Sequence, residues 1–136
     1  MQAPKKLFLV DDDEDDRDLF CEVVNQIDDS IECFHSTNGE LAIQELIQGK
    51  IPSPDLIFLD LNMPKFSGKQ CLAELKSMPE FRDIPVIIYS TSAEKKDIEE
   101  AKLLGASYFL TKPSKMIQLR KKLEELFSTD WNGNNV

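Results

Sequence analysis

Five short apolar segments, each followed by a stretch with helical periodicity, constrain the fold of this chain more than any other feature. The apolar segments are residues 6–10, 31–35, 56–59, 85–89 and 107–110. Apolar runs of this length are typical of strands that are covered on both faces. Strands that alternate with helices form parallel sheets with helices on both sides. We therefore predict an α/β fold with a five-stranded parallel sheet.

Polar residues at the expected helix starts support this alternation. A hydroxyl side chain can accept a hydrogen bond from the first free N–H groups of a helix. In two cases the residue three positions further on is Glu or Gln, which completes a capping box. The expected caps are Thr37, Ser67, Ser92 and Ser114.

Length and charge limit the organisation and the class of partner. A chain of 136 residues is expected to form one domain, which we place at residues 1–128, with a short polar tail at 129–136 in which Trp131 could dock. The net charge of −9 argues against binding to nucleic acid or to anionic membranes. We find no apolar run long enough to span a membrane and no signal peptide, so we expect a cytoplasmic protein.

The thiol and imidazole side chains exclude several kinds of site. Cys21, Cys33 and Cys71 are an odd number in apolar surroundings, so we interpret them as small buried hydrophobic residues in a reducing compartment. His35 is the single histidine of the chain, which rules out a histidine metal cluster. No nucleophile-elbow sequence accompanies it, so a Ser-His-Asp mechanism is not expected.

Polar residues gather where the apolar runs end. In parallel sheets, sites lie just beyond the carboxyl ends of the strands. The residues there are Asp11, Asp12, Asp13, Asp60, Ser90, Thr91 and Lys112. Carboxylates suit Mg²⁺, and a carboxylate can attack a phosphoryl group to form an acyl phosphate. A metal, a lysine and a hydroxyl can stabilise the charge of the transferred group.

Four motifs resemble the receiver domain of two-component response regulators. They are F-L-V-D-D-D, D-L-I-F-L-D-L-N-M-P-x-x-x-G, P-V-I-I-Y-S-T and G-A-S-Y-F-L-T-K-P, in the order of that family, and the resemblance covers about residues 5–127. It implies a doubly wound (βα)5 flavodoxin-like fold with strand order 2-1-3-4-5. No output domain follows, so the chain is similar to a stand-alone receiver.

The resemblance implies a phosphorylation site with a metal. Asp60 matches the phosphoacceptor, and Asp12 matches the acid that binds Mg²⁺ (or Mn²⁺) directly. Asp11 matches the neighbour that acts through a metal-bound water. Asn62 would contribute its backbone carbonyl to the metal, and its side chain, like that of Ser92, would flank the route of the hydrolytic water.

The resemblance also implies a group of residues that respond to phosphorylation. Ser90 matches the hydroxyl that bonds the phosphoryl group, and Lys112 the lysine that pairs with it. The Lys112–Pro113 bond is expected to be cis and to fix the direction of the lysine. Phe109 matches the aromatic switch position, and the size of Thr91 could restrict its path.

The seven acids between residues 11 and 18 need not share one role. If the first strand ran one residue longer, Asp12 and Asp13 would be the metal pair instead of Asp11 and Asp12. The spacing to Arg17 favours the pair Asp11–Asp12 in the resemblance. We expect Glu14, Asp15 and Asp16 to begin the first helix, where negative charge is favourable, and Asp18 to be solvated.

The function implied is a single-domain response regulator that accepts a phosphoryl group from a sensor histidine kinase and later hydrolyses it. Its output could be a histidine phosphotransfer protein, another partner, or a homodimer through the fourth helix, fifth strand and fifth helix. The segment K-S-M-P-E-F-R-D-I-P resembles receivers of phytochrome-type kinases. Alternatives are an interaction module that works without phosphorylation and a Mg²⁺-dependent phosphohydrolase. Against the latter, Asn62 stands where such enzymes carry an acid.

Overall fold

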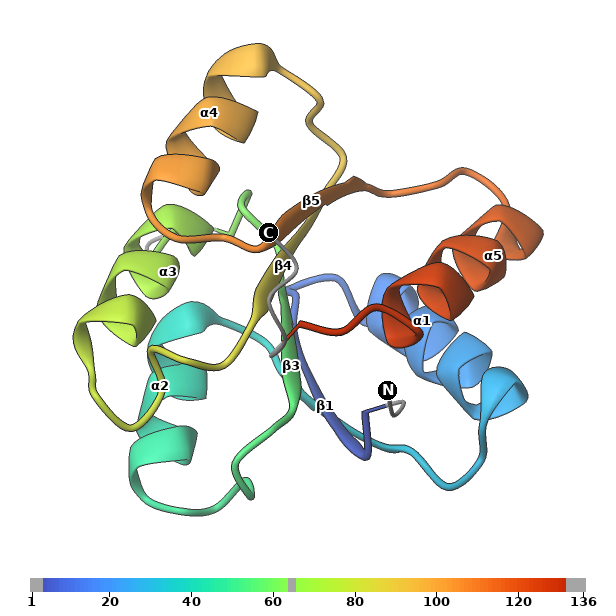
Figure 1. Cartoon of the computed structure of the whole chain (residues 1–136), viewed down its shortest axis with the longest axis horizontal. Helices are drawn as coiled ribbons and strands as arrows, with labels where there is room; N and C mark the ends of the chain where they lie inside the picture. Colours follow the sequence, from blue (N-terminus) through green and yellow to red (C-terminus); the bar gives the residue numbers. More distant parts are fainter. Residues whose placement is uncertain (1–3, 64–65, 132–136) are drawn as a thin grey trace.

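A five-stranded parallel sheet forms the centre of the molecule, with strand order β2-β1-β3-β4-β5 (Figure 1). The computed structural model describes residues 4–63 and 66–131. The elements, in chain order, are β1 (Lys6–Val10), α1 (Glu14–Ile27), β2 (Glu32–Ser36), α2 (Gly39–Ile47), β3 (Leu56–Leu59), α3 (Gly68–Ser77), β4 (Val86–Ser90), α4 (Lys95–Leu103), β5 (Tyr108–Thr111) and α5 (Met116–Phe127). The predicted doubly wound fold and its strand order are confirmed.

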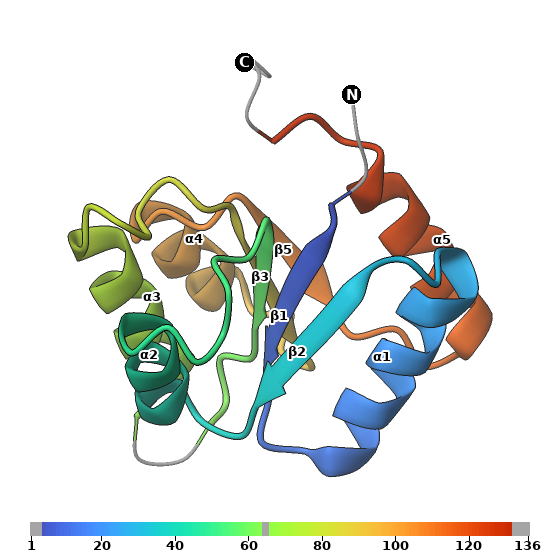
Figure 2. The same ribbon diagram turned by 90° about the horizontal axis from the view of Figure 1, so that it is seen from below.

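The helices form two layers, one on each face of the sheet. Helices α1 and α5 cover one face, and α2, α3 and α4 cover the other (Figures 1 and 2). Alternate residues of each strand enter different cores: Leu7 and Leu9 of β1 pack with α1 and α5, whereas Phe8 and Val10 pack on the opposite side. Because all four side chains are buried, β1 is apolar throughout, as the sequence predicted.

Three strands begin and end one residue later than expected. β2, β4 and β5 cover residues 32–36, 86–90 and 108–111, in place of 31–35, 85–89 and 107–110. Pro85 still contributes its carbonyl to the sheet, because it accepts a hydrogen bond from Ile57 N–H at 3.0 Å. The shift makes Ser90 the last residue of β4, so its side chain is fixed by strand geometry.

The capping residue was predicted correctly for α3 and wrongly for α2. At α3, Ser67 and Gln70 form the expected capping box. At α2 the cap is Asn38, whose side-chain oxygen accepts from Leu41 N–H at 2.7 Å, and Thr37 lies outside the helix. Asn is at least as good a cap as Thr, so the local pattern did not distinguish the two positions.

The expected caps of α4 and α5 are wrong. Helix α4 starts after Glu94 and α5 after Lys115, and neither residue makes a side-chain capping bond. The Ser92 hydroxyl donates to Asp97 Oδ2 at 2.7 Å and accepts from Glu94 N–H at 3.3 Å, but Ser92 lies two residues before the N-cap of α4. Ser114 precedes the N-cap residue Lys115 by one position and so lies outside α5.

The chain beyond α5 folds back onto the last strand. Trp131 donates its ring N–H to the Leu126 carbonyl at 3.0 Å. Its ring meets that of Tyr108 edge-on, with 6.4 Å between the centroids. Trp131 is therefore docked against the domain, as the sequence allowed. The rest of the predicted tail, residues 132–136, lies outside the described residues. In the part of the chain that the structure describes, no helix has the length and apolar content to cross a membrane.

The cysteines differ from their predicted burial. Cys71 is buried, as expected for a small hydrophobic residue, but Cys21 and Cys33 are only half-buried. Cys33 lies on the edge strand β2, which has a neighbour on one side only, and Cys21 lies on the α1 face near it. The prediction that all three are buried is wrong for this pair.

Candidate functional site

Three carboxylates meet at the carboxyl end of the sheet. Asp11 follows β1, Asp60 follows β3, and Asp12 lies beside them; one oxygen atom of each lies within 4.8 Å of the others. Asp11 and Asp60 are buried, whereas Asp12 is exposed. Three hard oxygen donors, two of them held in place by the fold and one facing solvent, form a set that fits Mg²⁺ or Mn²⁺.

Asp13 has a different task from its two neighbours. Its Oδ1 accepts hydrogen bonds from Asp15 N–H at 2.9 Å and Asp16 N–H at 3.3 Å, so it is the cap of α1. Asp13 lies outside the carboxylate cluster. The pair that faces Asp60 is therefore Asp11–Asp12, and the alternative pair Asp12–Asp13 is not formed.

Backbone and side-chain contacts fix Asp11 from several sides. Its N–H donates to the Ser36 carbonyl at 3.1 Å, and its Oδ1 accepts from Asp13 N–H at 3.0 Å. The buried Arg17 donates from Nη1 to the Asp11 carbonyl at 2.8 Å. Arg17 was used above only for its spacing from the acidic pair, but its guanidinium holds the loop that carries two of the three carboxylates.

The end of β3 holds Asp60 with equal tightness. Asp60 N–H donates to the Val10 carbonyl at 2.9 Å, and Asp60 Oδ1 accepts from Asn62 N–H at 3.0 Å. Gly68, the first residue of α3, lies directly against this turn. A Cβ at that position would collide with the Asp60 carbonyl oxygen, so only glycine fits there. The glycine of the D-x-x-x-x-x-x-x-G spacing thus allows the helix to approach the site.

Lys112 supplies the positive charge of the cluster. Its Nζ lies 2.8 Å from Asp11 Oδ2, 2.7 Å from Asp16 Oδ2 and 3.5 Å from Asp60 Oδ2. It also lies 5.2 Å from the centroid of the Tyr89 ring. Its own N–H donates to the Ser90 carbonyl at 2.7 Å, which continues the sheet past β5. Asp16, which the sequence placed only at a helix start, is therefore a partner of the lysine.

The expected cis bond before Pro113 is not present. The Lys112–Pro113 peptide is trans. For a bond before proline the two forms differ by only about 0.5–1 kcal/mol, so local contacts decide between them. Here the ion pairs of Lys112 with Asp11 and Asp16 direct its side chain into the site without a cis bond.

Burial and charge shift the proton affinity of the site. Burial raises the pKa of the Asp11 carboxyl to about 6, and nearby Asp60 adds to this, although hydrogen bonds from Lys112 and Asp13 oppose it. Burial alone would lower the pKa of Lys112, but its contacts with Asp11, Asp16 and Asp60 together raise it. One lysine therefore faces three carboxylates, Asp12 adds a fourth to the cluster, and the local excess of negative charge favours a cation.

A chain of hydrogen bonds leads from this cluster to helix α4. The buried Ser90 Oγ accepts from Asn62 Nδ2 and from Ser92 N–H, each at 3.2 Å. Ser92 in turn donates to Asp97 on α4 at 2.7 Å. The Asn62 side chain, expected only beside a water route, therefore contacts the hydroxyl of the site.

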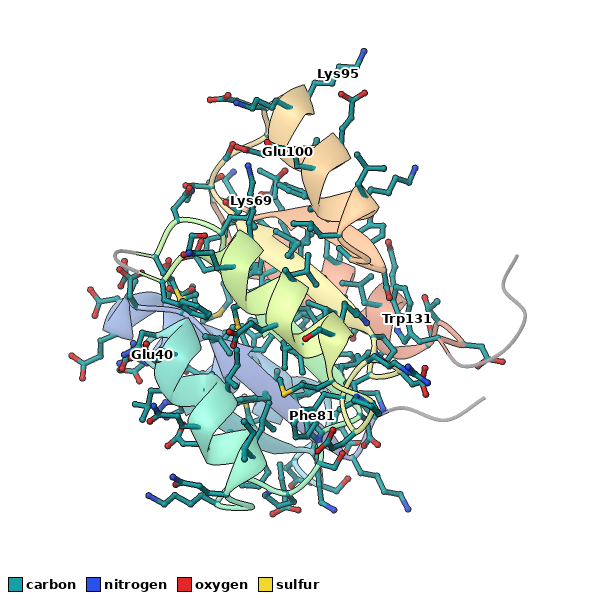
Figure 3. All side chains as sticks on the ribbon, turned by 90° about the vertical axis from the view of Figure 1, so that its left-hand side faces the viewer. Glu40, Lys69, Phe81, Lys95, Glu100 and Trp131 are labelled. Atoms are coloured by element: carbon teal, nitrogen blue, oxygen red, sulfur yellow. The ribbon has the colours of Figure 1, made fainter. Side chains whose placement is uncertain are left out.

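The same chain reaches a lysine on α3. Lys69 Nζ lies 2.9 Å from Asp97 Oδ1 and 2.8 Å from Glu100 Oε1 (Figure 3 shows Lys69 beside Glu100). These ion pairs tie the first turn of α3 to α4. No sequence pattern indicated them, because 28 and 31 positions separate the partners.

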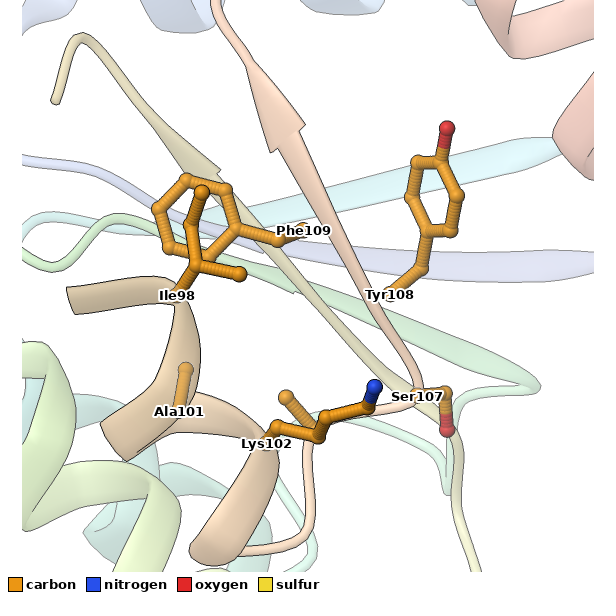
Figure 4. Close-up of a pocket in the computed structure, with 7 residues that line it drawn as sticks. Ile98, Ala101, Lys102, Ser107, Tyr108 and Phe109 are labelled. Carbon is orange, nitrogen blue, oxygen red and sulfur yellow. The ribbon is translucent and has the colours of Figure 1, made fainter. Parts of the chain in front are cut away.

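The expected switch residues lie on the strand next to the site. Phe109 is half-buried and faces the α4 side, near Ile98, whereas Tyr108 points to the other side (Figure 4). A hollow of about 380 Å³ adjoins Phe109 and is lined also by Ala101 and Lys102. Thr91 is exposed and does not line this hollow. The proposed inward movement of Phe109 stays a prediction.

Comparison with known proteins decides the family. Residues 7–124 match the response regulator receiver domain. The chain belongs to the response regulator receiver family. Its sequence is 33% identical over 129 residues to response regulator Rcp1 of Synechocystis sp., covering 92% of this chain and 88% of that protein.

Longer relatives and solved structures extend this comparison. The receiver is 35% identical over 124 residues to a protein-glutamate methylesterase/protein-glutamine glutaminase of Clostridium acetobutylicum, of which it spans only 34%. The phosphorylated cyanobacterial phytochrome response regulator RcpA aligns with a TM-score of 0.83 at 35% identity, covering 91% of each chain. The Mn²⁺-bound form of Rcp1 aligns with a TM-score of 0.82 at 32% identity, covering 98% of each chain.

Proposed function

We propose that this receiver is a single-domain response regulator that accepts a phosphoryl group on Asp60. The observation that carries the proposal is the fixed position of the Asp60 carboxylate, beside Asp11 and Asp12 and 3.5 Å from Lys112 Nζ. Such a set suits an aspartyl nucleophile, because the transferred group is negative and needs a metal and a lysine near it. Phosphorylation of the similar protein RcpA supports it.

The metal in this proposal is Mg²⁺ or Mn²⁺. Asp12 and Asp60 would bind it directly, Asp11 through water, and Asn62 through its backbone carbonyl. When bound, the metal supplies positive charge that reduces the repulsion between the carboxylates and an incoming phosphoryl group. The crowding of three carboxylate oxygens within 4.8 Å and the Mn²⁺-bound form of the similar protein Rcp1 support this assignment.

The residues of the receiver then perform the transfer. An oxygen atom of Asp60 attacks the phosphorus of a phosphohistidine in line, so that the P–O bond forms as the P–N bond breaks and the imidazole leaves with the electron pair. Lys112 moves from Asp11 and Asp16 onto a phosphoryl oxygen. Ser90 turns its hydroxyl from accepting hydrogen bonds to donating one to a second phosphoryl oxygen.

The response spreads from Ser90 and Lys112. Phosphorylation adds roughly 1.5–2 negative charges, which draw the loops after β4 and β5 toward the new group. Thr91 and Pro113 lie in these loops, and Phe109 would turn inward as Ser90 moves. Attack of water on the phosphorus, along the path flanked by Asn62 and Ser92, returns Asp60 to its free carboxylate.

The partners in this proposal follow from the chemistry of the site. The donor is the phosphohistidine of a sensor histidine kinase in the cytoplasm, and a phytochrome-type kinase is favoured by the similarity to RcpA. The output could be a histidine phosphotransfer protein that takes up the phosphoryl group, another partner protein, or a homodimer formed through α4, β5 and α5. Nucleic acid and membranes are not expected, given the net charge of −9. We take residues 1–128 as the receiver and 129–136 as a tail.

A mass measurement tests the proposal. Wild type and Asp60→Asn are incubated with a small phosphodonor such as acetyl phosphate, with Mg²⁺ or with a chelator. We expect one phosphoryl adduct on the wild type with Mg²⁺ and none with chelator or in the variant. Without an adduct, an interaction module that works without phosphorylation would be favoured. Steady turnover of phosphate esters would instead indicate a phosphohydrolase.

A further inference from the structure

Two thiols from different elements meet outside the acidic cluster. Cys21 lies on α1 and Cys33 on the edge strand β2, and both side chains line the same hollow. Both are half-buried and free. Neither the phosphorylation proposed above nor the packing of a closed core requires two thiols to face each other at this point.

The pair opens onto solvent. Cys21 and Cys33 line one hollow of about 540 Å³, together with Arg17, Glu22 and His35, among others. A small reagent can therefore reach the sulfur atoms from outside. Among residues 4–63 and 66–131, the groups of three or more metal-binding side chains include only Asp11, Asp12 and Asp60, so His35 does not complete a metal site with the two thiols.

The chemistry of the two sulfur atoms differs. The neighbouring Cys33 thiol lowers the pKa of Cys21, and Arg17 acts in the same direction, whereas burial and Asp18 oppose it. The neighbouring Cys21 thiol and burial raise the pKa of Cys33, which keeps its proton. Cys21 is thus the nucleophile of the pair, and Cys33 is a neighbouring thiol with a proton to give.

We propose that Cys21 and Cys33 form a reactive dithiol site that small disulfides of the glutathione class oxidise to an intramolecular disulfide. The Cys21 thiolate attacks one sulfur of the reagent, its S–S bond breaks, and a thiolate leaves. Cys33 then attacks the Cys21 sulfur, the mixed disulfide breaks, and the proton of Cys33 goes to the second leaving thiolate. The protein loses two hydrogen atoms, and the reagent is reduced to two thiols.

The third cysteine supplies a matched control inside the same chain. Cys71 is fully buried, and burial raises its pKa to about 12. Its Sγ faces the Gly39 carbonyl at 3.8 Å in the core on the opposite side of the sheet. We therefore expect Cys71 to react only in unfolded protein. Oxidation of Cys71 in the folded protein would mean that the reagent acts on thiols without regard to position.

The test uses the full chain under native conditions with oxidised glutathione, followed by intact mass measurement and peptide mapping without reductant. We expect the wild type to lose the mass of two hydrogen atoms and to yield one linked pair of peptides, those with Cys21 and Cys33. Cys71→Ser should behave as the wild type. Cys33→Ser should stop at a mixed disulfide on Cys21 and gain the mass of one glutathionyl group.

Other outcomes overturn the proposal. A wild type that keeps three free thiols, or that carries only mixed disulfides, has no reactive dithiol. A bridge that includes Cys71, or a disulfide between two copies of the chain, places the reactivity elsewhere. Circular dichroism of each variant verifies the fold, and a repeat in denaturant, where all three thiols are accessible, verifies that the reagent is active.

Discussion

At the scale of single residues, the buried Asp11 carboxylate should destabilise the metal-free receiver. Its pKa is raised from 3.8 to about 6, so ionising it costs more in the folded than in the unfolded chain. This unfavourable contribution to the free energy of unfolding is fully present above pH 6 and disappears as the pH falls below 3.8. In chelator at pH 8, Asp11→Asn should therefore raise that free energy by about 1–3 kcal/mol.

Denaturant unfolding at several pH values measures this effect. The advantage of Asp11→Asn should shrink between pH 7 and pH 4, since the wild-type carboxyl then takes up its proton. Mg²⁺ at pH 8 should stabilise the wild type more than the variant. A variant that is less stable than the wild type in chelator at pH 8 would contradict this account of the cluster.

A second prediction at this scale concerns the resting position of Lys112. Asp16 Oδ2 lies 2.7 Å from Lys112 Nζ, closer than Asp60 Oδ2 at 3.5 Å, so it competes with the phosphoryl group for the lysine. The side chain of Asp16 is 35% exposed, which limits the ion pair to about 1 kcal/mol. Asp16→Asn should accelerate phosphorylation by acetyl phosphate roughly two- to five-fold.

Initial rates of adduct formation, followed by mass measurement, test this competition. Asp15→Asn is the control, because Asp15 is an exposed neighbour on the same turn of α1 and forms no ion pair with Lys112. If the two variants change the rate equally, the effect comes from the general negative field. A slower Asp16→Asn would mean that Asp16 positions the lysine for the reaction.

At the scale of elements, Lys69 links α3 to α4. It pairs with Asp97 and Glu100, and Asp97 continues the hydrogen-bond chain to Ser92 and Ser90. Lys69→Met keeps most of the apolar stem but removes the charge. We expect faster amide hydrogen exchange in α4, with a loss of about 0.5–1 kcal/mol in the free energy of unfolding, because these ion pairs are partly exposed.

Hydrogen exchange measured by mass spectrometry on peptides of α4 tests this link. Lys95→Met is the control. Lys95 lies on α4 itself, points to solvent and forms no ion pair within the described residues (Figure 3). Faster exchange in α4 should occur for Lys69→Met only. Equal exchange in the two variants would show that the ion pairs do not hold the helix.

At the scale of the whole molecule, the apolar runs were sufficient to predict the sheet. Residues 7 to 10 are buried on both faces, so the run itself carries the signal of a central strand. The carboxylate cluster could be predicted for the same reason, because parallel strands end at one edge. Asp11, Asp60 and Lys112 therefore meet although 49 and 101 positions separate Asp11 from the other two.

Contacts between distant polar side chains could not be predicted in this way. Asp16 and Lys112 are 96 positions apart, and Asp16 also matched a local role at the start of a helix. Ser92 likewise matched a local role as a helix cap, whereas in the structure its hydroxyl binds Asp97 and α4 begins only after Glu94. Such contacts depend on how the helices and loops sit on the sheet, and a single sequence contains no periodic signal for that.

The central claim, that Asp60 is the phosphoacceptor, has one direct test. The phosphorylated receiver is treated with borohydride, which reduces an acyl phosphate to an alcohol and so converts the modified aspartate to homoserine, and the peptides are then sequenced by tandem mass spectrometry. Our account predicts homoserine at position 60 alone, and only after incubation with Mg²⁺ and a phosphodonor. Homoserine at position 11, 12 or 13, with Asp60 intact, would contradict it.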